Sequence, residues 1–227
     1  MIRKRLISIL MMLTMVVTMM PSLASADTLT GESQTYILLR AKSIGTKKVD
    51  LTWNKTKGAT KYVVYGNRSG KNNSVKLATV KKNKYTVEKI RNKKLLAHKI
   101  YKFQVKAYQG NGKLGSSKTI YFITGNTTKK YGNAKKIVAN RKTLKLESGE
   151  KAKVFASVKI YNNKKHLKIA NENRLRFISS NTKIAKVSKT GVVRGIAEGT
   201  ATIYIQDISG KYCKTKVIVT DGAGGYQ

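Results

Sequence analysis

One stretch of the sequence decides the fold class, and from Arg174 to Ile205 it reads RLRFISSNTKIAKVSKTGVVRGIAEGTATIYI. Leu175 and Phe177 flank Arg176 in the two-residue alternation that is typical of a half-buried strand. Further short apolar runs follow, and turns rich in Ser, Asn, Lys and Gly separate them. None of these runs has helical spacing, so the stretch predicts several short β-strands of a sandwich or barrel.

The strand pattern continues to the C-terminal side and includes the only cysteine of the chain. After the predicted hairpin turn Ile208-Ser209-Gly210, alternate positions hold Cys213, Thr215, Val217 and Val219. This alternation favours an inward-facing Cys213 that packs as a small hydrophobe. The alternative is a disulfide between two chains, because a lone thiol has no partner within its own chain.

A family resemblance enters through motifs that occur in a fixed order. These are Phe177-Ile178-Ser179-Ser180-Asn181, Ile184-Ala185-Lys186-Val187-Ser188, Gly191-Val192-Val193, Gly195 and Gly199-Thr200-Ala201-Thr202-Ile203. With them, residues 135–220 resemble a bacterial Ig-like domain of group 2, although Phe177 stands where that family usually has tryptophan. The resemblance implies a surface-exposed β-sandwich of bacterial cell-surface and adhesin-like proteins, and it implies no reaction.

The preceding part of the chain carries a second pattern of strands. Val49, Leu51 and Trp53 alternate, and so do the apolar positions from Tyr101 to Ala107. Residues 36–124 resemble a fibronectin type III domain, in which Tyr101, six residues after Leu95, would form the tyrosine corner. We expect Trp53 and Phe177 to anchor the two cores. The fold class predicted is therefore all-β, with two Ig-like antiparallel β-sandwiches in tandem.

Glycine-rich segments suggest where this first domain turns and where it ends. The segment from Gly66 to Gly70 predicts a loop, because glycines and polar residues interrupt the apolar pattern there. The segment from Gly125 to Gly132 predicts a short polar linker. We expect the two sandwiches to sit end to end on this linker and to unfold nearly independently.

The first 26 residues have the three-part layout of a secretory signal peptide. Basic residues open the chain, an apolar run extends from Leu6 to Met20, and Ala24-Ser25-Ala26 is a small-residue cleavage site. The alternative is a membrane anchor, but the run is short for a span of about 20 residues. We expect cleavage after Ala26, no transmembrane segment in the mature chain, and a secreted, extracellular or cell-surface location.

The charge of the chain is its most unusual global property. There are 47 Lys and Arg against 10 Asp and Glu, a formal net charge of +37. Both predicted domains share this excess, since Asp50 and Glu88 are the only acids between residues 36 and 124. Such a field attracts polyanions. Solubility alone is the other interpretation.

Residue types that carry catalysis or bind metal are sparse in this sequence. His98 and His166 are the only histidines, and neither has a metal-ligand type of residue at motif spacing. The chain has no Gly-rich phosphate loop and no nucleophile motif. We therefore expect no enzyme activity, no cofactor and no metal site.

Two features of the first domain are candidate sites for a polyanion. One is the basic run from Lys81 to Lys94; the other is a sheet face on which tyrosines and lysines alternate, where rings could stack on sugars or bases while cations hold phosphate or sulfate. The candidate residues are Lys81, Lys82, Lys84, Lys93, Lys94, Tyr65, Lys102, Lys106 and Tyr108. The run could equally be a solvated edge that lysine protects from aggregation, and the tyrosines could be scattered surface residues.

Together these features predict a non-enzymatic adhesion or binding module of the bacterial surface. Its expected partner is an anionic cell-wall polymer or an acidic polysaccharide. A structural spacer that binds another protein is the alternative, and binding of extracellular DNA is a further one.

Overall fold

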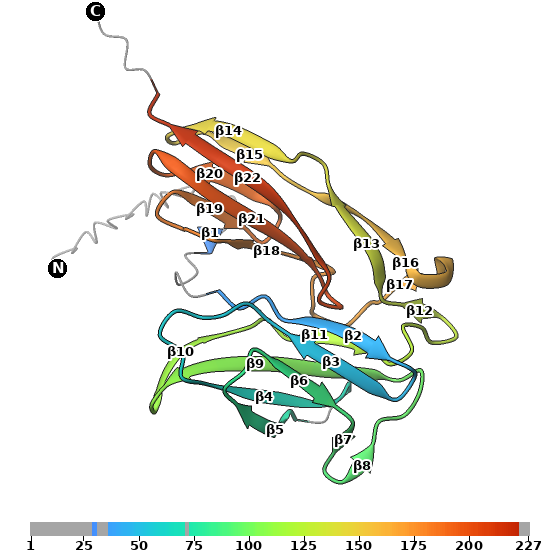
Figure 1. Ribbon diagram of the computed structural model, residues 1–227. Coiled ribbons are helices and arrows are strands. Elements are labelled where there is room, and N and C mark those ends of the chain that lie inside the picture. The colour runs from blue at the N-terminus through green and yellow to red at the C-terminus, as the bar shows by residue number, and fades with distance from the viewer. Residues whose placement is uncertain (1–28, 31–35, 71–72, 223–227) are drawn as a thin grey trace, which may run out of the picture.

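The computed structural model describes residues 29–30, 36–70 and 73–222, and the predicted signal peptide lies outside them. The described residues form β-strands and one short 3-10 turn, η1 (Tyr161–Asn163). The prediction of an all-β chain is confirmed, with two sandwiches that lie one above the other in Figure 1. No helix in the described part of the chain is long and apolar enough to cross a membrane.

The first sandwich packs a three-stranded sheet against a five-stranded sheet. The smaller sheet has the order β2 (Arg40–Ile44), β3 (Lys48–Thr52) and β6 (Lys84–Val87). The larger one has the order β10 (Gly112–Ser116), β9 (Ile100–Gln109), β4 (Lys61–Arg68) and β5 (Val75–Val80), and β11 (Ile120–Ile123) also pairs with β9. A small hairpin of β7 (Lys89–Ile90) and β8 (Lys93–Lys94) follows β6.

Aromatic residues fill the centre of this first core. Trp53 is fully buried, as predicted, and its ring meets that of Tyr62 edge-on at 5.4 Å between centroids. The hydroxyl of Tyr101 accepts a hydrogen bond of 2.9 Å from the backbone N–H of Leu96, so the predicted tyrosine corner is present. Such burial of large rings accounts for much of the stabilisation of a small sandwich.

The predicted loop from Gly66 to Gly70 is wrong in its first half, because β4 continues to Arg68. Gly66 pairs with Phe103 across β4 and β9, and a Cβ atom added to Gly66 would lie 2.7 Å from the Phe103 ring and 2.9 Å from Leu77. This glycine therefore allows close packing within a strand rather than a turn. Sequence alone does not separate these two uses of glycine.

The second sandwich has two four-stranded sheets and a separate two-stranded ribbon. The first sheet has the order β14 (Thr143–Glu147), β22 (Tyr212–Thr220), β21 (Gly199–Asp207) and β18 (Leu175–Ser179). The second has the order β1 (Leu29–Thr30), β19 (Ala185–Ser188), β20 (Val192–Gly195) and β15 (Lys151–Lys153). The ribbon pairs β13 (Ala134–Ala139) with β16 (Ala156–Ile160).

The pairing of β14 with β22 departs from the predicted antiparallel arrangement. Strand β14 runs parallel to β22, with Leu144 opposite Val217 and Leu146 opposite Val219. All four of these side chains are buried, so the parallel strand still alternates between core and solvent. Parallel pairing arises here because the chain leaves β13 on the ribbon and crosses to the edge of the other sheet.

The core of the second sandwich closes around Phe177, which is buried as predicted with 9% of its surface exposed. Gly191 has a φ of +87°, and a Cβ atom there would lie 2.3 Å from the Val154 carbonyl and 2.8 Å from the Phe177 ring. The predicted turn at Gly191 therefore needs glycine both for its backbone and for packing. Cys213 is half-buried and packs against this core, beside the fully buried Thr215 and Val217.

The two sandwiches contact each other beyond the linker that joins them. Ile123 of the first domain and Leu167 and Ile208 of the second form a fully buried apolar cluster between them. The turn between β21 and β22 lies next to β2 and β11 of the first domain (Figure 1), and the Tyr121 N–H donates to the Ile208 carbonyl at 2.9 Å. The expectation that the two domains unfold independently considered only the linker. This contact comes from residues that are distant in the sequence.

The predicted linker is itself folded. Thr127 and Gly132 form a β-bridge, and β12 (Tyr131–Gly132) pairs in parallel with β17 (Lys165–His166) of the second domain. A Cβ atom on Gly132 would lie 2.7 Å from Ile160, so the chain passes close to the second sandwich at this point. This segment, together with the β21–β22 turn, forms what we call the domain joint.

Candidate functional site

Four of the residues proposed as a polyanion site come together on the outward face of β4 and β9. Tyr65, Lys102, Lys106 and Tyr108 all point away from the core, and we call this surface the tyrosine face. The Lys106 ammonium lies 4.6 Å from the centroid of the Tyr65 ring, a distance at which a cation–π contact forms. Partial burial, and then the charge and hydroxyl of Tyr108, raise the pKa of Tyr65.

The sheet that carries the tyrosine face contains basic residues but no Asp or Glu in any of its five strands. Lys76 lies opposite Tyr65 on β5, while Lys61 and Lys113 lie opposite Tyr108 on its two neighbouring strands. Sequence reasoning missed these three lysines, because strand register brings them to the face. The two rings thus lie within a lysine array without compensating carboxylates in its strands.

The basic run from Lys81 to Lys94 does not form one surface. Lys81 and Lys82 lie in the turn before β6 and Lys84 begins that strand, whereas Lys93 and Lys94 form β8 beyond its other end. All five side chains are exposed. A four-residue strand spans about 10 Å, so β6 separates the run into two groups.

Each of these two groups has a carboxylate close by. The hollow lined by Lys81, Lys82 and Lys84 also contains Asp50, which accepts a hydrogen bond of 2.6 Å from the Thr86 hydroxyl. Beside the other group, Glu88 is 2.8 Å from the Lys48 ammonium. Lys48, and to a smaller extent Lys89 and Lys94, lower the pKa of Glu88. The two groups are therefore partly neutralised, unlike the tyrosine face.

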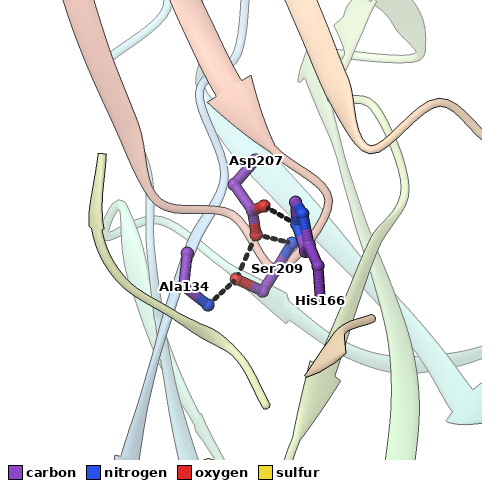
Figure 2. Close-up of polar contacts among 4 residues, drawn as sticks. All are labelled: Ala134, His166, Asp207 and Ser209. Atoms are coloured by element: carbon purple, nitrogen blue, oxygen red, sulfur yellow. Dashed lines mark hydrogen bonds and ion pairs between the residues drawn. The ribbon is translucent and has the colours of Figure 1, made fainter. Parts of the chain in front are cut away.

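The domain joint contains a buried polar network that sequence reasoning missed. His166 Nε2 contacts a carboxylate oxygen of Asp207, while the backbone N–H and the hydroxyl of Ser209 both bind the other oxygen (Figure 2). The Ser209 hydroxyl oxygen also accepts from the Ala134 N–H at 3.1 Å. The Asp207 side chain is fully buried, so these bonds replace its contacts with water. His166 and Asp207 are 41 residues apart, and no sequence motif joins them.

The sequence of contacts in this network, from Ser209 to Asp207 to His166, fits a structural role and not a catalytic one. A nucleophilic serine would have to meet the histidine, which takes its proton. Here Asp207 lies between the two, and the Ser209 hydroxyl donates a hydrogen bond to the carboxylate instead of to the histidine. Within the described residues, no group of three or more His, Cys, Asp or Glu is arranged to hold a metal ion.

Aromatic and polar contacts extend the joint beyond this network. The hydroxyls of Tyr36 and Tyr204 are 3.2 Å apart, and Tyr204 also meets the Tyr212 ring edge-on. The side-chain amide of Gln206 donates to the Leu39 carbonyl at 2.8 Å. The second domain thus contacts the first through both apolar and polar groups.

Comparison with known proteins identifies both sandwiches. Residues 38–123 match the family described as fibronectin type III domain, and residues 152–219 match the family described as bacterial Ig-like domain (group 2). Both families are non-catalytic, and the second is typical of bacterial surface proteins. No curated protein matches the chain.

Solved structures resemble part of the chain. An Fn3-like protein from Clostridium thermocellum is 20% identical, with 39% of this chain and 92% of that chain covered and a TM-score of 0.33. A crystal structure of titin domains is 22% identical, with a TM-score of 0.32. The similar region covers 38% of this chain and only 30% of the titin chain.

Proposed function

We propose, from the premise that the chain carries a fibronectin type III domain followed by a bacterial Ig-like domain of group 2, that it is an exported, non-enzymatic surface protein that holds an anionic polymer. The domains would span residues 36–124 and 135–220, after a signal peptide of residues 1–26. The ligand would be an anionic cell-wall polymer or an acidic polysaccharide.

The observation that carries this proposal is the tyrosine face. Its lysines surround two partly buried rings, and none of the five strands beneath them contains a carboxylate. Lysines would neutralise phosphate, sulfate or carboxylate groups, while Tyr65 and Tyr108 would lie against sugar rings. The exposed groups Lys81, Lys82, Lys84 and Lys93, Lys94 could add outlying contacts for an extended chain.

The test is retention of the mature protein on immobilised poly(glycerol phosphate), polygalacturonate and DNA at about 150 mM salt, close to the physiological ionic strength. We expect retention on one of the two wall-type or polysaccharide columns, with steep loss as salt is raised, since screening acts within about 8 Å under those conditions. Absence of retention on both columns would contradict the proposal.

The residues of the face are tested by substitution. Tyr65→Ala with Tyr108→Ala should weaken the salt-resistant part of binding by about fivefold or more, since stacking on an aromatic ring contributes about 1–3 kcal/mol. Lys102→Gln with Lys106→Gln should weaken it more than the charge-matched control Lys145→Gln with Lys216→Gln in the second domain. Equal losses in the two lysine pairs would mean that a diffuse field, and not the face, binds the polymer.

The domain joint favours a second candidate function, a spacer that carries another protein. Buried contacts such as the cluster of Ile123, Leu167 and Ile208 would hold the two domains in one orientation. A spacer needs this fixed geometry but no polymer ligand. Retention on DNA alone would instead favour the nucleic-acid alternative.

A further inference from the structure

A surface hollow lies at the domain joint, at the end of β9 where that strand begins. It is a cleft of about 960 Å³ that receives residues from both domains and from the folded linker. The first domain supplies Arg68 and Lys99, the linker supplies Lys129, Lys130 and Tyr131, and the second domain supplies Lys164. We call it the joint cleft.

The charged side chains that line the joint cleft are all basic. Five Lys or Arg residues line it and no Asp or Glu does. The four other surface hollows compared with it all contain a carboxylate, from Asp50 in two of them and from Glu172 in the other two. Within the part of the chain that the structure describes, none of the five cations has a carboxylate partner.

Hydrogen bonds fix the backbone on which these cations stand. The Thr128 hydroxyl accepts from the N–H groups of Lys130 and Tyr131, and the Lys130 carbonyl accepts from the Lys165 N–H at 3.1 Å. The His98 ring donates from Nδ1 to the Thr127 carbonyl at 2.8 Å, which ties the linker to the first domain. Because this backbone is held in place, the cations that it carries stay near each other and repel each other. A bound anion would reduce that repulsion.

One aromatic ring is placed among these charges. Tyr131 is half-buried against the apolar cluster of the joint, and the Lys130 ammonium lies 5.3 Å from its ring centroid. The exposed part of such a ring offers a flat surface to a sugar or glycerol unit. A ring flanked by cations matches a polymer in which neutral units alternate with anionic groups.

We propose that the joint cleft binds a segment of an anionic polymer that carries phosphate or sulfate groups, held by lysines of both domains and the linker and by the Tyr131 ring. For the identity of the polymer this rests on the proposed function, but the cleft shares no lining residue with the tyrosine face. Because cations from both domains would share one ligand, binding would also stabilise the domain joint.

The cleft is tested with a short probe that needs no long polymer. Tripolyphosphate should raise the Tm of the mature protein, and the dissociation constant should be obtained by calorimetric titration. The variant Lys99→Gln/Lys129→Gln/Lys130→Gln/Lys164→Gln should bind tripolyphosphate at least tenfold more weakly than wild type. The charge-matched control Lys145→Gln/Lys153→Gln/Lys183→Gln/Lys214→Gln, with four exposed lysines spread over the second domain, should lose less than threefold. Equal weakening in the two variants, or no binding by wild type, would overturn the proposed cleft.

The two proposals fail in different ways in a second measurement. Poly(glycerol phosphate) and dextran sulfate are then compared as soluble competitors of tripolyphosphate. The polymer that displaces it at the lower concentration shows whether the cleft prefers phosphate or sulfate groups. Competition by neither would overturn the polymer assignment of the cleft. Retention of wild type on polymer columns together with unchanged retention of the cleft variant would leave the proposed function standing and remove the cleft. Binding of tripolyphosphate in the cleft without retention on any column would overturn both the proposed function and the polymer assignment, and would leave only a site for small anions in the cleft.

Discussion

His166 and Asp207 form a buried pair at the point where the two sandwiches meet, although their strands, β17 and β21, belong to different sheets. His166 contacts one oxygen of the Asp207 carboxylate, and Ser209 binds the other. Asp207 is fully buried while His166 retains 17% of its side-chain exposure. The imidazole therefore shields this carboxylate from solvent.

Replacement of His166 by alanine should lower the free energy of unfolding by about 1.5–3 kcal/mol, the usual contribution of a hydrogen bond to a charged group. Chemical denaturation measures this loss, and Lys168→Ala, an exposed neighbour, is the matched control. Combined with Asp207→Ala, the change should cost less than the sum of the single substitutions, because they remove the same contact. Strict additivity would show that the pair does not interact.

The apolar cluster of the joint should make the two domains unfold together. Leu167→Ala removes a fully buried side chain and should cost about 2–5 kcal/mol. Scanning calorimetry should show one transition for wild type and two for this variant. Trp53→Ala should accordingly lower the whole wild-type transition, and two separate wild-type transitions would contradict coupling through the joint.

Tyr204 should make stability depend on alkaline pH. Burial, followed by its hydrogen bond with Tyr36, raises the pKa of Tyr204 well above 10. Above pH 10 the unfolded chain releases this proton and the folded chain retains it, so the contribution of Tyr204 to stability decreases as pH rises. Tyr204→Phe should be about 1 kcal/mol less stable at pH 8, the usual contribution of one hydrogen bond.

The stability of Tyr204→Phe should approach that of wild type between pH 10 and about pH 11. Denaturant titrations of both proteins at several pH values measure the difference, and comparison within the pair cancels the titration of the many lysines. A constant difference across this range would contradict the shifted tyrosine.

Cys213 should react slowly with thiol reagents in the folded protein. Its side chain is half-buried and burial raises the pKa of the thiol, so the reactive thiolate is scarce at neutral pH. Labelling should accelerate on addition of denaturant, since unfolding exposes the thiol and removes the burial that raises its pKa. A reducible dimer on a gel would instead support the intermolecular disulfide.

The sequence by itself determined which residues face inward on most strands and where several turns fall. The alternation of Val49, Leu51 and Trp53 predicted their burial, and the resemblance to fibronectin type III domains predicted the tyrosine corner at Tyr101. These features depend on backbone geometry within a few residues, since side chains alternate along a strand. The motifs around Phe177 and Gly191 predicted the second sandwich through their resemblance to a family, and residues 152–219 match that family.

Only the tertiary structure decided which residues from distant segments lie beside each other on a surface or in the core. Strand register brought Lys76 beside Tyr65, and the β21–β22 turn brought Asp207 to His166. Gly66 proved to be a packing residue because Phe103, far along the chain, occupies the space of a side chain there. Such contacts depend on where distant segments meet after folding, and local patterns in a sequence carry no record of those distances. The joint cleft is the clearest instance, because three separate segments supply its charges.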